Sequence, residues 1–265
     1  MRSPRTFTKI IGACCNYGQP KIGTHKAPEI IRSYFHKGLD MDMINGFDQD
    51  GTGYIQLYAL HNHYLQLRHK VITVGGDHSI SLSTVASSAE KYKDDLTVVW
   101  VDAHPDLHTR ESSVTKHIHG MALGSILGLD NLFNLPTIQP HQLIYIAIRD
   151  IDSYEQQMIR DLNIEYYTME YIQTYGLTSI LANIKNIDSP IHLSLDVDSI
   201  DPQYFKSTGT PVKNGLTLGD ISQIIDSLKS KIVSTDIVEF NPYLSNNERK
   251  HQEAKYIVKY IHQLL

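Results

Sequence analysis

Short apolar stretches rich in β-branched residues alternate along the chain with longer stretches of helical period. This alternation predicts an α/β protein with a mainly parallel sheet. Because the expected strands are almost continuously apolar, helices should cover both faces of that sheet. The expected strands are 7–13, 71–74, 96–101, 143–148, 164–167, 191–195 and 232–238, and the expected helices are 28–35, 54–68, 81–92, 154–162, 177–184, 218–228 and 247–265.

No Gly/Ser-rich or Pro-rich linker, internal repeat or low-complexity tract divides the sequence, so residues 1–265 are expected to form a single domain. Three stretches are polar, contain Gly or Pro and lack periodicity: 16–26, 104–119 and 199–217. Functional loops in α/β proteins follow the carboxyl ends of strands, so these stretches are the first place to look for a site.

Composition and charge narrow the class of protein. With 265 residues, 41% hydrophobic and 20% charged, the chain is neither disordered nor collagen-like nor a coiled coil. Its 24 basic and 29 acidic residues give a net charge of 24 − 29 = −5. This charge provides no positive field for nucleic acid or an anionic membrane, so neither is expected as a partner.

The amino-terminal region contains only a short apolar run after Lys9, too short for a signal peptide or a membrane span. Cys14 and Cys15 are adjacent, which is a poor arrangement for a disulfide between them. A chain without a disulfide framework suits a reducing compartment, and the cytoplasm is the expected location.

Metal-competent side chains follow three of the expected strands. Strand 96–101 leads into Asp102, His104 and Asp106, which would share one face if the backbone stayed extended. Strand 191–195 leads into Asp196 and Asp198. In a parallel sheet, neighbouring strands bring their carboxyl ends to the same edge, so these side chains are expected to converge.

The third cluster is Gly75-Gly76-Asp77-His78, in which two glycines would let the backbone turn sharply before the imidazole. Together the clusters would contribute two imidazoles and four carboxylates. Four close carboxylates repel one another unless cations neutralise them, and two divalent ions would balance four negative charges. A two-metal site is therefore the simplest interpretation.

Each motif has an ordinary structural interpretation when taken alone. A single D-x-D often caps a helix or forms a turn, and a single buried histidine is often merely hydrogen-bonded. The occurrence of three such motifs at three strand ends favours the metal site. Oxygen and nitrogen ligands without thiolates suit Mn²⁺, or alternatively Fe, Co or Ni, better than a structural zinc.

These motifs resemble those of the ureohydrolases, and among them most closely the arginases. The blocks that carry the resemblance are G-G-D-H-S at 75–79, D-A-H-P-D at 102–106, S-L-D-V-D-S-I-D-P at 194–202 and T-G-T-P at 208–211. The segments 18–23, 148–152 and 236–242 are also similar to family blocks. The resemblance implies a three-layer α/β/α fold with a mainly parallel sheet of about eight strands, two Mn²⁺ ions and hydrolysis of a guanidino group.

The resemblance further implies how the ions are held. Asp102 and Asp196 would bridge the two ions, with an activated hydroxide between them. The other ligands would be His78 and Asp106 for one ion, and His104 and Asp198 for the second.

Two further residues match family positions that act on the substrate. Glu239, in V-E-F-N-P, would pair with the guanidinium, for which a carboxylate is a good planar partner; the alternative for Glu239 is an acid at a helix start. His119, in H-G-M, would shuttle a proton to the leaving amine. With them, the ligand Asp106 completes the expected catalytic set.

The resemblance is weaker where the amino-acid end of a substrate would bind. Asp152 matches the acid that receives the α-amino group, with a helix N-cap as an equal alternative. Arginases usually carry Asn, Ser and Asn where this chain has His108, Thr115 and His117, and the first two positions receive the α-carboxylate. Asn214 replaces a usual glycine, although Asn tolerates positive φ better than most residues.

The leading hypothesis is a cytoplasmic binuclear manganese enzyme that converts L-arginine to L-ornithine and urea. The alternatives are a ureohydrolase acting on agmatine or another guanidino compound, and an inactive ureohydrolase scaffold that only binds ligands. The family resemblance also implies a homo-oligomer, either a trimer or a hexamer.

Overall fold

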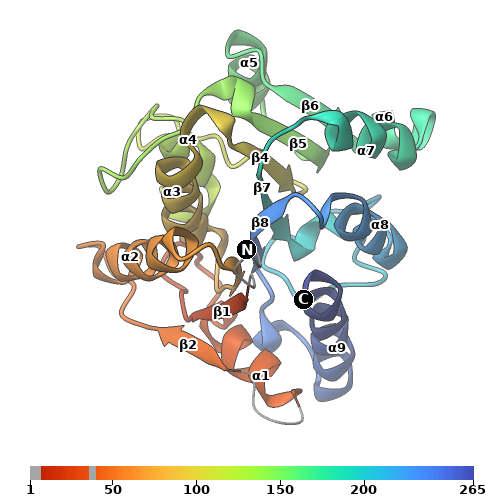
Figure 1. Cartoon of the computed structure of the whole chain (residues 1–265). Helices are drawn as coiled ribbons and strands as arrows, with labels where there is room; N and C mark the ends of the chain where they lie inside the picture. Colours follow the sequence, from red (N-terminus) through yellow and green to blue (C-terminus); the bar gives the residue numbers. More distant parts are fainter. Residues whose placement is uncertain (1–6, 36–39) are drawn as a thin grey trace, which may run out of the picture.

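Eight strands form one sheet in the order β2-β1-β3-β8-β7-β4-β5-β6 in a computed structural model that describes residues 7–35 and 40–265 (Figure 1). Every neighbouring pair is parallel, so the expected parallel eight-stranded sheet is confirmed. The strands are β1 Thr8–Ala13, β2 Met41–Ile44, β3 Lys70–Val74, β4 Thr97–Val101, β5 Leu143–Ile148, β6 Glu165–Thr168, β7 Ile191–Asp196 and β8 Ile232–Val238.

Helices cover both faces of the sheet, as the continuously apolar strands predict (Figure 1). Side chains alternate between the faces: Val98 and Trp100 pack in one core cluster, whereas Val99 and Val101 pack in the other. The first face carries α2 Thr52–Gln66, α3 Ser81–Tyr92, α4 Ala122–Ile126 and α5 Ser153–Asp161, and the second carries α1 Ala27–Ser33, α6 Met169–Tyr175, α7 Leu177–Asn186, α8 Leu218–Leu228 and α9 Asn247–Leu264.

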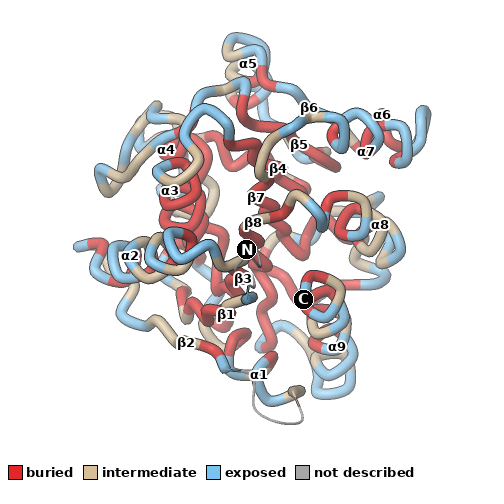
Figure 2. The backbone as a smooth tube through the Cα atoms, viewed as in Figure 1, coloured by how far each residue is buried: buried red, intermediate tan, exposed pale blue. Residues whose placement is uncertain are grey.

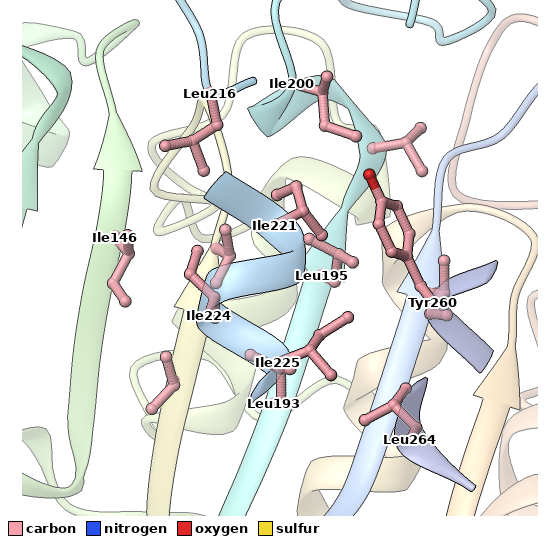
Figure 3. Close-up of a cluster of buried hydrophobic side chains, with 14 of the residues drawn as sticks. Ile146, Leu193, Leu195, Ile200, Leu216, Ile221, Ile224, Ile225, Tyr260 and Leu264 are labelled. Atoms are coloured by element: carbon pink, nitrogen blue, oxygen red, sulfur yellow. The ribbon is translucent and has the colours of Figure 1, made fainter. Parts of the chain in front are cut away.

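The strands of the sheet are buried along much of their length (Figure 2), and side chains of β7 and of the helices on the second face pack against each other there (Figure 3). Leu193 and Leu195 of β7 point toward Ile221 and Ile225 of α8 and are fully or almost fully buried. Each side chain of this size contributes about 1.5–3 kcal/mol when it leaves water. Tyr260 of α9 closes the cluster, and its hydroxyl donates a hydrogen bond to a backbone carbonyl of α8 at 3.3 Å.

Three elements were not expected from the hydrophobic pattern: β2, α4 and α6. β2 is a four-residue edge strand with Asp42 in its middle, and three of its four residues are only partly buried. Helices α4 and α6 contain five and seven residues, too few for helical periodicity to be visible. All seven strands expected from the pattern are present.

The sheet order places the strands with candidate site residues next to one another. β3, β8, β7 and β4 are consecutive neighbours, and their carboxyl ends lie at one edge. None of the helices in the two described segments is long and apolar enough to cross a membrane.

Candidate metal centre and active-site cavity

His78 lies four residues beyond the end of β3 and faces three carboxylates from two other strand ends. Its Nδ1 is 3.0 Å from Asp102 Oδ2, 3.1 Å from Asp106 Oδ2 and 3.1 Å from Asp196 Oδ2. The imidazole is fully buried and stacks on Trp100 with ring centroids 4.0 Å apart. The convergence expected from the sequence is therefore present in the structure.

A second group adjoins the first and shares Asp102 with it. His104 Nδ1 is 3.2 Å from Asp198 Oδ2 and 3.5 Å from Asp102 Oδ1. Asp102 thus directs one carboxylate oxygen toward each imidazole. This is the position that a carboxylate bridging two ions would occupy.

The backbone brings these side chains together in a different way from the one expected. β4 ends at Val101, and Asp106 has φ 51°, so the residues after the strand converge through bends and not along one face of an extended strand. Neither Gly75 nor Gly76 has a positive φ in the turn before His78. A Cβ at Gly76 would lie 1.9 Å from the carbonyl oxygen of Cys15, so glycine is needed there for close packing.

The electrostatics of the centre indicate a deficit of positive charge. Burial, followed by repulsion from Asp198 and Asp102, raises the pKa of Asp196 well above its usual value. Burial likewise raises the pKa of Asp106 and Asp198, and nearby Asp102 raises them further. No Lys or Arg side chain in the described segments forms an ion pair with these carboxylates.

Protonated imidazoles of His78 and His104 would supply positive charge at these carboxylates. Burial would lower the pKa of His78, but the close carboxylates of Asp102, Asp106 and Asp196 raise it well above its usual value. His78 Nδ1 nevertheless makes no hydrogen bond of normal geometry. A buried nitrogen directed at three carboxylate oxygens fits a cation, since oxygen and imidazole ligands suit Mn²⁺ and similar ions.

Glu239 follows β8 and lies beside the metal centre. It is buried, has φ 66°, and accepts a hydrogen bond from the His78 amide at 2.9 Å. Its second oxygen accepts a hydrogen bond from Gln19 Nε2 at 3.0 Å. A non-glycine residue with positive φ next to a cluster of candidate ligands is the kind of strain found at functional sites. Glu239 does not begin a helix, so the alternative interpretation of this acid is wrong.

His119 lies close to both Glu239 and Gln19. Its Nδ1 is 3.5 Å from Glu239 Oε1 and 3.4 Å from Gln19 Nε2. Burial would lower the pKa of His119, but the pairing with Glu239 raises it to about 9. His119 therefore carries a proton at neutral pH and can donate it.

A cavity of about 250 Å³ leads to this centre. His108 and Asp152 form part of its wall, and their side chains bond to each other at 2.9 Å between Nε2 and Oδ2. His108 also stacks on Tyr154, with ring centroids 5.2 Å apart. Thr115 is exposed and is not among the lining residues, which are His104, Asp106, His108, His119, Gly120, Asp150, Asp152, Glu155, Asp196, Asp198 and Thr210.

Asp152 has two structural partners. Its Oδ1 accepts a hydrogen bond from the Glu155 amide at 2.9 Å, which caps α5 as the alternative interpretation expected. Its Oδ2 faces His108 at the cavity wall. The capping interaction therefore does not remove Asp152 from the site. Asn214 has φ 62°, so the residue that replaces the usual glycine adopts the positive φ that Asn tolerates better than most residues.

Several residues at the site were not predicted from the sequence, among them Gln19, Trp100, Glu155 and Thr210. Burial raises the pKa of Glu155 to about 8, and this carboxyl lines the cavity one helical turn after Asp152. The Thr210 hydroxyl donates to Asp198 Oδ2 at 2.9 Å. Gln19 lies in block 18–23 and Thr210 in block 208–211, both of which resemble family blocks. A single polar residue within such a block does not by itself indicate a role at the site.

The fold and the site define an α/β protein with a carboxylate- and imidazole-lined centre suited to cations at the carboxyl edge of its sheet. The chain belongs to the arginase family, whose profile matches residues 8–264. This confirms the ureohydrolase resemblance inferred from the motifs.

Individual relatives agree with this assignment. The arginase of Coccidioides posadasii (strain C735) is 40% identical over 195 residues, which is 66% of this chain and 60% of that protein. The matched region spans about 60% of the length of the curated relatives from Coccidioides and Neurospora.

Solved structures are similar over nearly the whole chain. The crystal structure of arginase from Bacillus subtilis has a TM-score of 0.88 and 31% identity and covers 98% of both chains. The crystal structure of Entamoeba histolytica arginase in complex with L-ornithine has a TM-score of 0.88 and 29% identity, covering 98% of this chain and 99% of that chain.

Proposed function

We propose that the chain is a binuclear manganese hydrolase that cleaves the guanidino group of L-arginine to L-ornithine and urea. The observation that carries the proposal is the meeting of two imidazole–carboxylate groups, joined through Asp102, beside a cavity that His119 lines, with Glu239 buried next to His119. Membership of the arginase family supports the same reaction class.

Six residues would hold the two ions. Asp102 would be shared by the two ions, because one of its oxygens faces each imidazole, and Asp196, which faces His78, would be the second shared ligand by the family pattern. When bound, the cations would supply positive charge that acidifies water and stabilises negative charge in the transition state. The remaining ligands would be His78, Asp106, His104 and Asp198; Fe, Co or Ni are the alternative ions.

Glu239 would bind and orient the substrate guanidinium. Its carboxylate is buried, and pairing with His119 lowers its pKa against the opposing effect of burial, so it is ionised at neutral pH. A planar cation can bond to both oxygens of a carboxylate, which fixes the orientation of its central carbon. Gln19 holds one of these oxygens and thereby limits the rotation of the carboxylate.

His119 would donate a proton to the leaving nitrogen. The guanidino C–N bond breaks more easily when the departing amine is protonated, because a neutral amine leaves in place of an amide anion. His119 is protonated at neutral pH and partly exposed to the cavity, so it can recover a proton from solvent after each turnover.

The amino-acid end of the substrate would bind nearer the cavity mouth. Asp152 would receive the α-amino group, and His108 would contact the α-carboxylate. Thr115 was proposed for the same carboxylate, but its exposed position gives it less support.

The test is urea release from Mn²⁺-loaded protein with L-arginine, agmatine and other guanidino acids, with the released amine identified by mass spectrometry. We expect L-arginine to give ornithine and urea with the highest kcat/KM. Metal-loaded protein that binds guanidino compounds but releases no urea from any of them would support the inactive-scaffold alternative.

Agmatine is the second candidate substrate. The bond between His108 and Asp152 favours it, because this bond occupies the group expected to bind the carboxylate that agmatine lacks. Higher kcat/KM for agmatine than for arginine in the same panel would establish this alternative. The expected trimer or hexamer is a separate prediction, which light scattering of the purified protein would test.

A further inference from the structure

A buried chain of hydroxyl groups connects His78 to Asp236 in the interior of the protein. His78 Nε2 is 2.8 Å from Ser194 Oγ, which is 3.4 Å from Ser81 Oγ. The Ser81 hydroxyl donates to Asp236 Oδ2 at 2.9 Å. All four side chains are fully buried, so no solvent competes for these hydrogen bonds.

The partners of Asp236 fix the direction of this chain. Asp236 Oδ2 also accepts hydrogen bonds from the Thr84 hydroxyl and from His192 Nε2, the latter at 3.1 Å. Because a carboxylate only accepts, Ser81 must use its single hydroxyl proton on Asp236. Ser81 is then an acceptor for Ser194, and Ser194 in turn is an acceptor for His78 Nε2–H.

We propose that Asp236 is a positioning residue that fixes the tautomer and ring orientation of His78 through Ser81 and Ser194. With the proton held on Nε2, the Nδ1 lone pair is available on the side of the ring that faces Asp102, Asp106 and Asp196. Outer partners of ligating histidines act in this way in other metal sites. The inference rests on the proposed metal role of His78.

The experiment compares removal of the Ser81 hydroxyl with removal of the Thr84 hydroxyl. Ser81 and Thr84 both donate to Asp236 Oδ2, but only Ser81 also contacts Ser194. Mn²⁺ affinity is measured by calorimetry on the full-length protein for wild type, Ser81→Ala and Thr84→Val. Ser81→Ala should weaken the binding of one ion about 10- to 100-fold, whereas Thr84→Val should change it less than about 3-fold.

A double-mutant cycle on Mn²⁺ affinity tests whether Ser81 acts through Ser194 or whether each substitution only disturbs packing. If Ser81 acts through Ser194, Ser194→Ala should weaken Mn²⁺ binding, and adding Ser81→Ala should cause little further loss. Additive losses, or equal losses in Ser81→Ala and Thr84→Val, would overturn the proposal. If Ser81→Ala does not fold, the isosteric Asp236→Asn serves as the second variant, and unchanged Mn²⁺ affinity in it would also overturn the proposal.

His78→Asn separates this inference from the proposed function. If His78→Asn loses Mn²⁺ affinity while Ser81→Ala does not, the proposed positioning role of Asp236 is wrong, whereas the metal role of His78 is supported. If His78→Asn binds Mn²⁺ as tightly as wild type, the proposed metal role fails, and the positioning role fails with it.

Discussion

His108 Nε2 lies 2.9 Å from Asp152 Oδ2, so two residues expected to contact opposite charges of an amino acid contact each other. Ser112 Oγ, 3.0 Å from Nδ1, and the stacked ring of Tyr154 hold the imidazole in this orientation. A substrate with both an α-amino and an α-carboxylate group would have to insert between these partners. We therefore expect the His108–Asp152 pair to affect how well the cavity distinguishes guanidino substrates that differ at the end away from the guanidino group.

His108→Asn should shift specificity toward L-arginine. The smaller amide would free Asp152 for the α-amino group and still donate a hydrogen bond to the carboxylate. One hydrogen bond to a charged group contributes about 1.5–3 kcal/mol, so the ratio of kcat/KM for arginine over agmatine should rise about 10-fold or more. An unchanged ratio would mean that this wall of the cavity does not contact the carboxylate.

Removing either carboxylate proposed to bridge the two ions should remove metal. Asp102→Asn or Asp196→Asn would leave fewer negative charges around His78 and His104, and we expect at least one ion per chain to be lost, with a large fall in activity. Elemental analysis of the purified variants measures the loss. Asp150→Asn is the control, since Asp150 lies 3.6 Å from His104 but is not a proposed ligand. Full metal content in both bridging variants would contradict the assignment.

Glu239→Gln should separate substrate binding from metal binding. The amide keeps the shape of the carboxylate but not its charge, so both ions should remain while the guanidinium loses its partner. Loss of one member of a buried charge pair costs about 2–5 kcal/mol, which corresponds to roughly 30- to 4000-fold in kcat/KM. Near-normal turnover with normal metal content would exclude Glu239 from the mechanism.

The buried His61 should make the fold sensitive to acid. It lies in α2 with Nε2 2.8 Å from Ser234 Oγ, and burial lowers its pKa to about 3. In the unfolded chain the pKa is near 6.5, so between pH 6.5 and 3 the unfolded state binds more protons and stability falls as the pH falls. From pH 7 to pH 5 this residue should cost about 2 kcal/mol of unfolding free energy.

Urea denaturation at pH 7 and pH 5 measures this effect. His61→Gln should lose about 2 kcal/mol less than wild type over that interval, because Gln does not titrate. His63→Gln, which replaces an exposed histidine in the same helix, should behave like wild type. Equal acid sensitivity in wild type and His61→Gln would show that His61 is not held neutral in the folded protein.

The sequence by itself determined the fold class and the chemistry of the site. Alternating apolar runs identified seven of the eight strands, because buried parallel strands are continuously apolar and need no long-range information to be recognised. The D-A-H-P-D, D-V-D and G-G-D-H blocks identified the metal-binding chemistry, because paired carboxylates and imidazoles after strand ends are rarely needed for folding alone. β2 was missed because a short, half-polar edge strand is defined by its neighbour β1.

Only the tertiary structure decided which side chains meet. The sheet order β3-β8-β7-β4 brings residues more than 100 positions apart to one edge, and no local pattern encodes that order. The same holds for Gln19 beside Glu239, 220 residues away, and for His108 bonded to Asp152. Such contacts depend on where loops pack in three dimensions. The chemistry could therefore be recognised from local motifs, whereas the specificity of the cavity depends on long-range contacts.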